Sequence, residues 1–214
     1  MQQKLKHRKT KLKSLLYYEK KFKKRGYNFI IGVDEAGRGC LAGPVVAAAV
    51  KLKNTHFKNR IDDSKKLTAS QREKAFLELM DKSIFGIGIV NEKIIDRLNI
   101  LTATRIAMEE AITALIEKLK HYKKQCIHVL VDGNVKLDIN FPFANIIKGD
   151  SKSFSIASAS ILAKVTRDRI MFLYDKAYPQ YGFLQHKGYA TKMHRVALRR
   201  CGPCLIHRET FHYV

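Results

Sequence analysis

The stretch Phe29-Ile30-Ile31-Gly32-Val33-Asp34-Glu35-Ala36-Gly37-Arg38-Gly39 organises the chain. An apolar run leads directly into two adjacent acids, and an arginine between two glycines follows. The run predicts a buried strand that ends at the acids. Because neighbouring strand residues point to opposite faces, Asp34 and Glu35 can serve one site only at a strand end, where the pleating relaxes. Gly37 and Gly39 allow the backbone to come close to a bound partner.

The composition indicates a globular protein that binds a polyanion. The chain has 214 residues, 46% of them hydrophobic and 28% charged, which fits one domain. Lys and Arg number 41 against 19 acids, giving a net charge of +22 that suits nucleic acid. No apolar stretch approaches the roughly 20 residues that span a bilayer. The N-terminus has no apolar signal region, so we expect a cytoplasmic protein whose four cysteines are reduced thiols.

Residues 1–27 form a basic arm. Residues 1–26 hold eleven Lys or Arg against a single acid, Glu19. Their apolar residues recur at spacings that allow one helical stripe, namely at Leu5, Leu12, Leu15, Leu16 and Phe22. We therefore expect a helix that packs on the domain and shows its basic face to solvent. Such an arm is also compatible with nucleic-acid binding.

The remaining chain reads as strands followed by alternating strands and helices. Further strands are predicted at residues 44–50, 84–90, 126–131 and 144–147, and helices near residues 70–82, 101–121, 155–177 and 191–200. Thr68 or Ser70 can cap the first of these helices. Gly86 and Gly88 indicate close packing or a bulge in their strand. This order predicts an α/β domain with a mixed sheet flanked by helices.

Carboxylates follow three of the predicted strands: Asp34 with Glu35, then Asp132, then Asp150. Function gathers at strand ends in open α/β sheets. Converging acids raise each other's pKa unless a cation neutralises them, and all-oxygen ligand sets suit Mg²⁺ or Mn²⁺. In a strongly basic protein, this combination points to two-metal hydrolysis of a phosphodiester, which needs no Ser, Cys or His nucleophile.

The motifs of this chain, taken in order, strongly resemble those of bacterial ribonuclease HII, a type 2 ribonuclease H. The first is the segment from Asp34 to Gly39, continued by Ala42-Gly43-Pro44-Val45-Val46. The others are Asp63-Ser64-Lys65-Lys66-Leu67, Val131-Asp132-Gly133-Asn134, Lys148-Gly149-Asp150, Ser160-Ile161-Leu162-Ala163-Lys164-Val165-Thr166-Arg167-Asp168, Tyr178-Pro179-Gln180-Tyr181-Gly182-Phe183, His186-Lys187-Gly188-Tyr189 and His207-Arg208-Glu209-Thr210-Phe211. The resemblance covers residues 28–214 and leaves only the basic arm outside.

The resemblance implies a ribonuclease-H-like fold with a helical C-terminal region and a metal site of Asp34, Glu35, Asp132 and Asp150. It implies hydrolysis of the RNA strand of RNA–DNA hybrids and incision 5′ of single ribonucleotides in duplex DNA, leaving 3′-hydroxyl and 5′-phosphate ends. Gly37, Arg38 and Gly39 match the segment that senses the 2′-hydroxyl, and Tyr189 matches the tyrosine that packs on the sugar. The candidates for phosphate contacts are Lys65, Lys66, Lys164, His186 and Lys187.

Each of these residues has a plainer interpretation when it is taken alone. Asp132 would be a turn residue, Asp150 a helix cap and Tyr189 a packing residue. Lys65 and Lys66 would lie on a solvated face, and His186 would be an ordinary loop histidine. The ordered set of motifs favours the functional interpretation.

Cys201-Gly202-Pro203-Cys204 has the form of a thioredoxin redox motif. Only ten residues follow Cys204, too few for the helix that such a fold needs. With His207 and His212 the spacing also allows a zinc site, which the resemblance does not require.

Two rival functions remain. The sister enzyme ribonuclease HIII carries a large extra N-terminal domain, for which this arm is too short, and Arg38 between two glycines fits HII better. The second rival is a non-catalytic basic protein that binds nucleic acid and whose acids are structural. We expect a monomer, because nothing in the sequence demands an oligomer.

Overall fold

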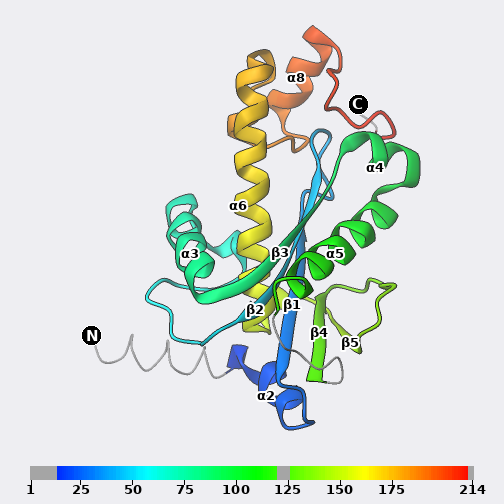
Figure 1. Ribbon diagram of the computed structural model, residues 1–214. Coiled ribbons are helices and arrows are strands. Elements are labelled where there is room, and N and C mark those ends of the chain that lie inside the picture. The colour runs from blue at the N-terminus through cyan, green and yellow to red at the C-terminus, as the bar shows by residue number, and fades with distance from the viewer. Residues whose placement is uncertain (1–13, 120–125, 212–214) are drawn as a thin grey trace.

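A mixed sheet of five strands forms the centre of the molecule, shown in the computed structural model of Figure 1. The structure describes residues 14–119 and 126–211. The spatial order of the strands is β3-β2-β1-β4-β5; β1 pairs antiparallel with β2 and parallel with β4. The strands are β1 (Phe29–Ala36), β2 (Val45–Leu52), β3 (Ser83–Val90), β4 (Ile127–Asp132) and β5 (Phe143–Ile146). The predicted α/β class with a mixed sheet is confirmed.

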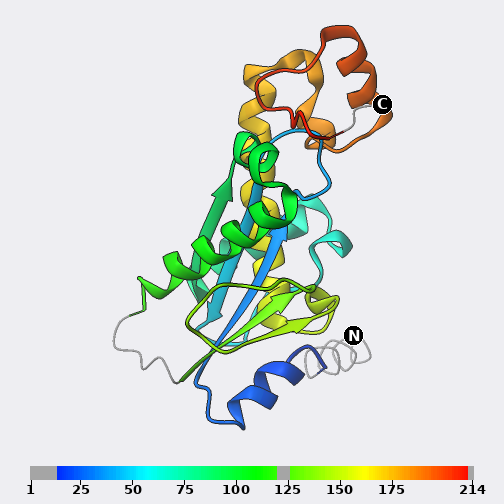
Figure 2. The same ribbon diagram turned by 90° about the vertical axis from the view of Figure 1, so that its right-hand side faces the viewer.

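Helices cover both faces of this sheet. The α-helices are α2 (Tyr17–Lys23), α3 (Ala69–Lys82), α4 (Glu92–Leu98), α5 (Ile100–Ile116), α6 (Phe154–Ala177), α7 (Phe183–His186) and α8 (Lys192–Cys201), and the short 3₁₀ helices are η1 (Ser64–Lys66), η3 (Gly149–Ser151) and η4 (Pro179–Tyr181). Figure 2 shows α5 in front of the sheet and α6 behind it. Each helix buries an apolar cluster against its own face. The sheet is therefore the middle layer of three.

Helix α5 approaches the edge strand β3 unusually closely. A Cβ atom at Gly86 would lie 2.1 Å from the carbonyl oxygen of Ala111, and one at Gly88 would lie 2.0 Å from that of Ala107. Any side chain at these positions would collide with the helix backbone. Close packing, not a bulge, is thus the reason for the two glycines.

The described part of the basic arm is helical and packs on the domain. Leu15 and Phe22 are buried, as the predicted stripe requires, whereas Leu5 and Leu12 lie outside the described residues. Glu19 is buried as well. It accepts hydrogen bonds from the hydroxyl of Ser153 at 2.6 Å and from the amide of Ser155 at 2.9 Å. These groups lie at the N-terminus of α6, where a helix favours negative charge.

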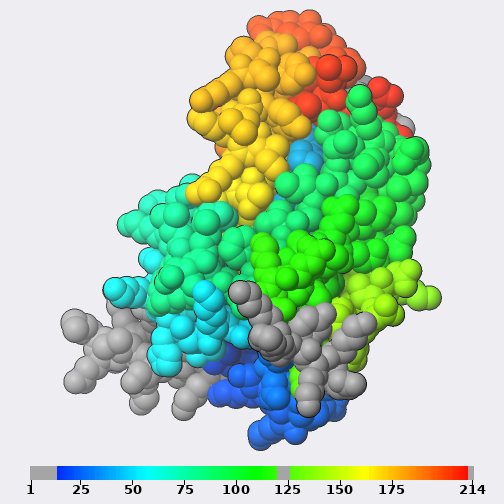
Figure 3. Space-filling view, viewed as in Figure 1, coloured from blue at the N-terminus to red at the C-terminus, as the bar shows by residue number. Residues whose placement is uncertain are grey.

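The C-terminal region is largely helical and rises above the sheet as a separate lobe, as Figure 3 shows in yellow to red. Its core includes Met171 from the end of α6, Phe183 from α7 and Leu198 from α8. Leu41 and Ala42, from the loop after β1, belong to the same cluster. The lobe therefore packs directly on the segment that follows the two adjacent acids.

The structure differs from the predictions at a few boundaries. The helix expected over residues 101–121 ends at Ile116, and the separate helix α4 precedes it. Strand β1, predicted to end at the two acids, continues through them to Ala36. The cap of α3 is Thr68, whose capping box uses Gln71. Within the described residues, no helix has the length and apolar character needed to cross a membrane.

Candidate functional site

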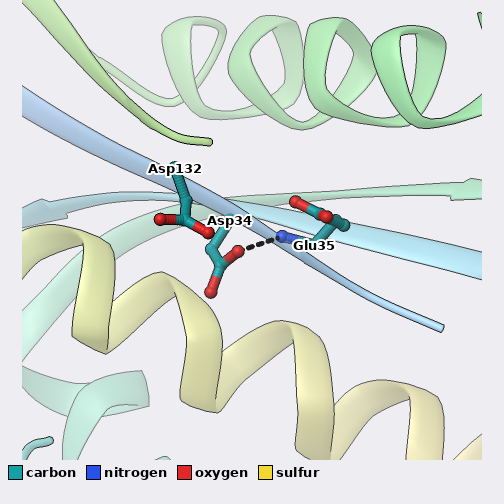
Figure 4. A group of neighbouring side chains, drawn as sticks. All are labelled: Asp34, Glu35 and Asp132. Atoms are coloured by element: carbon teal, nitrogen blue, oxygen red, sulfur yellow. Dashed lines mark hydrogen bonds between the residues drawn. The ribbon is translucent and has the colours of Figure 1, made fainter. Parts of the chain in front are cut away.

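Three of the predicted acids converge in the structure. Asp34, Glu35 and Asp132 each offer an oxygen, and these oxygens all lie within 4.8 Å of one another. Figure 4 shows Asp34 pointing toward α6, with Asp132 beside it and Glu35 on the other side of β1. Among the described residues, this is the one group of three or more His, Cys, Asp or Glu side chains close enough to share an ion.

The acids can converge because β1 and β4 separate at the end of their pairing, a feature that we call the fork. The pairing of β1 with β4 ends at Val33 and Val131, whereas the pairing of β1 with β2 continues to Ala36. Asp34 and Glu35 therefore stay in strand conformation and point to opposite faces, but the β4 side of β1 is open at their level. Asp132, the last residue of β4, closes onto this opening. The predicted relaxation at a strand end is replaced by the separation of two strands.

Burial and mutual repulsion disfavour the charged forms of these acids. Burial raises the pKa of Asp34 well above its ordinary value, and the charges of Glu35 and Asp132 raise it further. Hydrogen bonds from the Ser160 hydroxyl and the Glu35 amide act in the opposite direction. Burial also raises the pKa of Glu35, although the nearby guanidinium of Arg38 opposes that rise. The site therefore holds more negative charge than its surroundings neutralise.

This donor set fits a hard divalent cation. The converging atoms are carboxylate oxygens, the ligands that Mg²⁺ and Mn²⁺ prefer. A cation would relieve the repulsion that raises the pKa of Asp34. The residues in position to hold it are Asp34, Glu35 and Asp132.

Asp150 lies beside this group but outside the set of three. It occupies η3 and is buried. Burial raises the pKa of its carboxyl, and the charges of Asp63 and Asp132 raise it further, while Lys65 lowers it. The preceding residue, Gly149, donates its amide to Oδ1 of Asp132 at 2.5 Å. Asp150 is thus linked to the site by the hydrogen bond of Gly149 to Asp132 and by the electrostatic effect of the Asp132 charge on its own carboxyl.

The segment Gly37-Arg38-Gly39 follows the acids directly. Gly37 is buried with a φ of +99°, a conformation that favours glycine. Arg38 and Gly39 are exposed, and a Cβ at Gly39 would meet no atom within 4 Å. A guanidinium nitrogen of Arg38 lies 3.2 Å from a carboxylate oxygen of Glu35. This ion pair joins the segment to the group of acids.

Tyr189 lies next to this segment. It forms an isolated antiparallel bridge with Cys40, which follows Gly39. The residue is 40% exposed, and the ammonium of Lys164 lies 5.5 Å from the centroid of its ring. Lys164 is also paired with Asp168 at 2.8 Å. Tyr189 thus presents an exposed aromatic face beside the glycine segment.

The other predicted phosphate contacts have varied surroundings. Lys65 and Lys66 are exposed on η1, where Lys66 pairs with Asp63 at 3.4 Å. The ammonium of Lys187 donates to the carbonyl of Leu184 at 2.7 Å. His186 is buried, and its Nε2 and Nδ1 bond to the backbone of Tyr181 and Gly188. The ring of His186 therefore has no nitrogen left for a phosphate, which makes its role structural.

Sequence reasoning did not assign roles to three residues that shape this site. Ser160 bonds to the Asp34 carboxylate, and the signal for it was its position four residues before Lys164, on the same helical face. Arg167 and Arg208 are fully buried behind the glycine segment. Nothing in the sequence pattern separates these two arginines from exposed ones.

Among the described residues, the two cysteines of the CxxC motif belong to no group of three or more side chains close enough to bind a metal ion together. Cys201 is exposed, and Sγ of Cys204 lies 3.2 Å from Nδ1 of His207. The ring of His207 bonds through Nε2 to His194 at 3.0 Å, so it belongs to a buried histidine pair. His212, the other ligand considered, lies outside the described residues.

Comparisons with known proteins identify the family of this chain. The model of the family "Ribonuclease HII" matches residues 31–214. The ribonuclease HII of Ruminiclostridium cellulolyticum is 52% identical over 203 residues, covering 94% of this chain and 76% of the relative. That of Acetivibrio thermocellus is 54% identical and covers 91% of this chain and 73% of the relative.

Solved structures give the same fold. The ribonuclease H2 of Pyrococcus horikoshii superposes with a TM-score of 0.68 at 26% identity, covering 86% of this chain and 94% of the other. Bst-RNase HIII, solved in complex with Mn²⁺, gives a TM-score of 0.70 at 17% identity over 88% of this chain and 68% of the other, a likeness of fold alone. The chain therefore belongs to the ribonuclease HII family, hydrolases that cleave RNA within RNA–DNA hybrids.

Proposed function

We propose that this ribonuclease H incises duplex DNA on the 5′ side of a single embedded ribonucleotide, besides hydrolysing the RNA strand of hybrids. It leaves 3′-hydroxyl and 5′-phosphate ends, and two metal ions assist the reaction. The observation that carries the proposal is the contact between the acid group and the glycine segment. The oxygens of Asp34, Glu35 and Asp132 lie within 4.8 Å of one another, and the first exposed residue of the segment is Arg38, three residues after Glu35.

The four acids are proposed to hold the ions. Asp34, Glu35 and Asp132 form one ligand set, and Asp150, which senses the charge of Asp132, extends it. When bound, Mg²⁺ or Mn²⁺ supplies the positive charge that activates an attacking water and stabilises the leaving oxygen. The Glu35 amide and the Ser160 hydroxyl keep the Asp34 carboxylate oriented meanwhile.

The selection of the ribonucleotide is assigned to Gly37, Arg38, Gly39 and Tyr189. Backbone groups at the glycines can approach the 2′-hydroxyl, the group that distinguishes RNA from DNA, where a side chain would block them. Gly39 leaves that space open. The exposed ring of Tyr189 lies beside the segment and offers an apolar surface to the sugar.

Binding of the duplex is assigned to the basic surface. Lys65 and Lys66 on η1 are exposed, Lys65 lies near Asp150, and Lys164 lies near the ring of Tyr189. Contacts of this kind position the phosphate backbone and read no bases. We propose that the protein acts as a monomer in the cytoplasm and that its incision is the first step in the removal of ribonucleotides from DNA.

The test is incision of a labelled DNA duplex that contains one ribonucleotide, with Mg²⁺ or Mn²⁺, compared with an RNA–DNA hybrid and with an all-DNA duplex. We expect one cut, 5′ of the ribonucleotide, by the unmodified protein and none by Asp34→Asn. Asp81→Asn is the matched control, because Asp81 is exposed on α3. Absence of incision by the unmodified protein would overturn the proposal. Binding without cleavage of any substrate would instead favour a nucleic-acid binder with structural acids.

A further inference from the structure

Two fully buried arginines lie behind the glycine segment. Arg167 of α6 and Arg208 of the C-terminal segment are both 0% exposed. Neither forms an ion pair with an acid among residues 14–119 and 126–211. Burying a guanidinium is costly unless its N–H groups are satisfied. The groups that satisfy them therefore have to be held firmly in place.

Backbone carbonyls of the loop after β1 satisfy Arg208. Its guanidinium donates to the carbonyl of Gly37 at 2.7 Å and to that of Arg38 at 2.9 Å. It also donates to the carbonyl of Gly43 through two nitrogens, at 2.8 and 3.0 Å. One planar side chain thus fixes three peptide groups of a single loop.

Arg167 holds the same loop from another side. Its guanidinium donates to the carbonyls of Ala42 and Pro44 and to that of Lys187, at 2.9 to 3.0 Å. A Cβ at Gly37 would lie 2.1 Å from Nε of Arg167, so the backbone of Gly37 rests directly on this side chain.

The direction of these carbonyls sets the direction of two amides. In a trans peptide the C=O and N–H point opposite ways, and no peptide bond in the described chain is cis. The carbonyl of Gly37 shares its peptide with the amide of Arg38, and the carbonyl of Arg38 shares its peptide with the amide of Gly39. Because Arg208 draws both carbonyls inward, both amides face away from it. Arg38 and Gly39 are the exposed residues of the segment.

The segment that carries Arg208 is itself anchored. The amide of Arg208 donates to the carbonyl of Leu41 at 2.9 Å. The next two residues, Glu209 and Thr210, donate their amides to the carboxylate of Asp96 in α4, at 2.9 and 3.0 Å. The guanidinium is thus placed by contacts on both sides of it in the sequence.

We infer that Arg208 is a positioning residue for substrate choice: by binding the carbonyls of Gly37 and Arg38, it presents the amides of Arg38 and Gly39 as paired donors to the sugar and phosphate at the cleavage point. The inference rests on the proposed recognition of a ribonucleotide by this segment. The C-terminal lobe thereby contributes to specificity through a residue that does not touch the substrate.

Two measurements on Arg208→Lys test it, because lysine keeps the charge but its single ammonium cannot reproduce the planar fork whose three nitrogens reach the carbonyls of Gly37, Arg38 and Gly43. The first is the NMR order parameter S² of the Arg38 and Gly39 backbone amides in the free protein. We expect rigid values near 0.85 in the unmodified protein and values below about 0.6 in the variant. The second is the ratio of dissociation constants for an all-DNA duplex and a matching duplex with one ribonucleotide, in Ca²⁺. We expect this ratio to fall at least fivefold, with little change for the all-DNA duplex.

Two control variants separate positioning from loss of stability. Leu79→Ala removes a fully buried side chain far along the chain from the loop, and it should lower the melting temperature without changing the ratio. Asp96→Ala leaves Arg208 in place and releases the anchor of Glu209 and Thr210, and it should lower the ratio by a smaller factor than Arg208→Lys.

The outcomes distinguish the inference from the function on which it rests. Unchanged amide order together with an unchanged ratio in Arg208→Lys overturns the inference. A ratio of one in the unmodified protein overturns the proposed recognition of the ribonucleotide, and the amide order then still decides whether Arg208 fixes the loop. An equal loss of affinity for both duplexes shows a general structural role and contradicts the inference.

Discussion

The backbone amide of Glu35 donates a hydrogen bond of 2.7 Å to Oδ1 of Asp34, its neighbour in β1 (Figure 4). This bond orients a carboxylate that is 5% exposed and surrounded by other acids. Burial and the charges of Glu35 and Asp132 both raise the pKa of Asp34, so its ionised form costs free energy in the metal-free protein. The most buried acid of the site is therefore also the one that gains most from a cation.

Asp34→Asn should abolish cleavage and yet leave the metal-free protein at least as stable as the unmodified one. The amide keeps the shape of the side chain and removes the repulsion. A metal at about 100 times its dissociation constant adds about 2.7 kcal/mol to the free energy of unfolding. We expect Mn²⁺ to raise the melting temperature of the unmodified protein and not that of the variant. A variant that is strongly destabilised without metal would contradict this account of the site.

Asp150→Asn separates the fourth acid from the other three. Asp34, Glu35 and Asp132 form the close group, and Asp150 adjoins it from η3. We expect kcat to fall at least about 100-fold, in the range of a lost electrostatic contact to the transition state, whereas calorimetry still detects Mn²⁺ binding. Asp63→Asn is the control, since it preserves the cap of η1 and removes a charge beside Asp150. Complete loss of Mn²⁺ binding would place Asp150 in the same ligand set.

The fold and the acids were predictable because they rest on local patterns. The apolar strand before Asp34, the long helix near residues 155–177 and the acids behind three strands are readable from periodicity and position. The fork was not predictable. Whether β1 ends at Asp34 or continues depends on its partners, and β2 continues to pair where β4 does not.

The remaining parts of the site depend on contacts between distant segments. His186 is followed by a lysine and looks like a surface residue, but tertiary packing buries its ring against His194. Arg208 and Gly37 are 171 residues apart, and their bond exists only once the C-terminal lobe has packed on the loop after β1. Neither contact can be predicted from the spacing of residues in the sequence.

Glu19→Ala should weaken the packing of the basic arm on the domain and lower the stability of the protein. The carboxylate of Glu19 accepts hydrogen bonds from the hydroxyls of Ser153 and Ser155 and from the amide of Ser155. Its removal leaves buried donors unpaired at the start of α6, at a cost of about 1–3 kcal/mol. Urea unfolding measures the loss. Lys23→Ala, on the exposed face of α2, should change stability by less than about 0.5 kcal/mol, and equal losses in the two variants would contradict the role of Glu19.

His128→Phe should stabilise the protein. Both ring nitrogens of His128 are buried without a hydrogen-bond partner in the described part of the chain. The ring stacks on Phe22 with centroids 3.7 Å apart and planes at 19°, a position that a phenyl ring can also occupy. Removing two unsatisfied polar atoms should add about 1 kcal/mol to the free energy of unfolding at pH 7. His128→Ala should have the opposite effect because it leaves a cavity.

Stability should decrease as the pH falls from about 6.5 to about 4, and the buried pair His194 and His207 contributes to this decrease together with His128, whose pKa burial also lowers to about 4. Burial lowers the pKa of each to about 4 in the folded protein. The unfolded chain, with a pKa near 6.5, therefore binds more protons in this interval. Each histidine thus adds a loss of about 1.4 kcal/mol per pH unit, whereas above pH 6.5 its contribution is fully present.

The hydrogen bonds explain why the pair resists protonation. His194 Nδ1 donates to the carbonyl of Tyr189, and His207 Nδ1 accepts from the amide of Cys204. A single proton between the two Nε2 atoms, 3.0 Å apart, then completes the network with both rings neutral. Urea unfolding from pH 4 to 8 should be measured in an Asp34→Asn background, because the raised pKa of Asp34 stabilises the folded state as the pH falls. His207→Gln should reduce the slope, and an unchanged slope would show that other groups cause it.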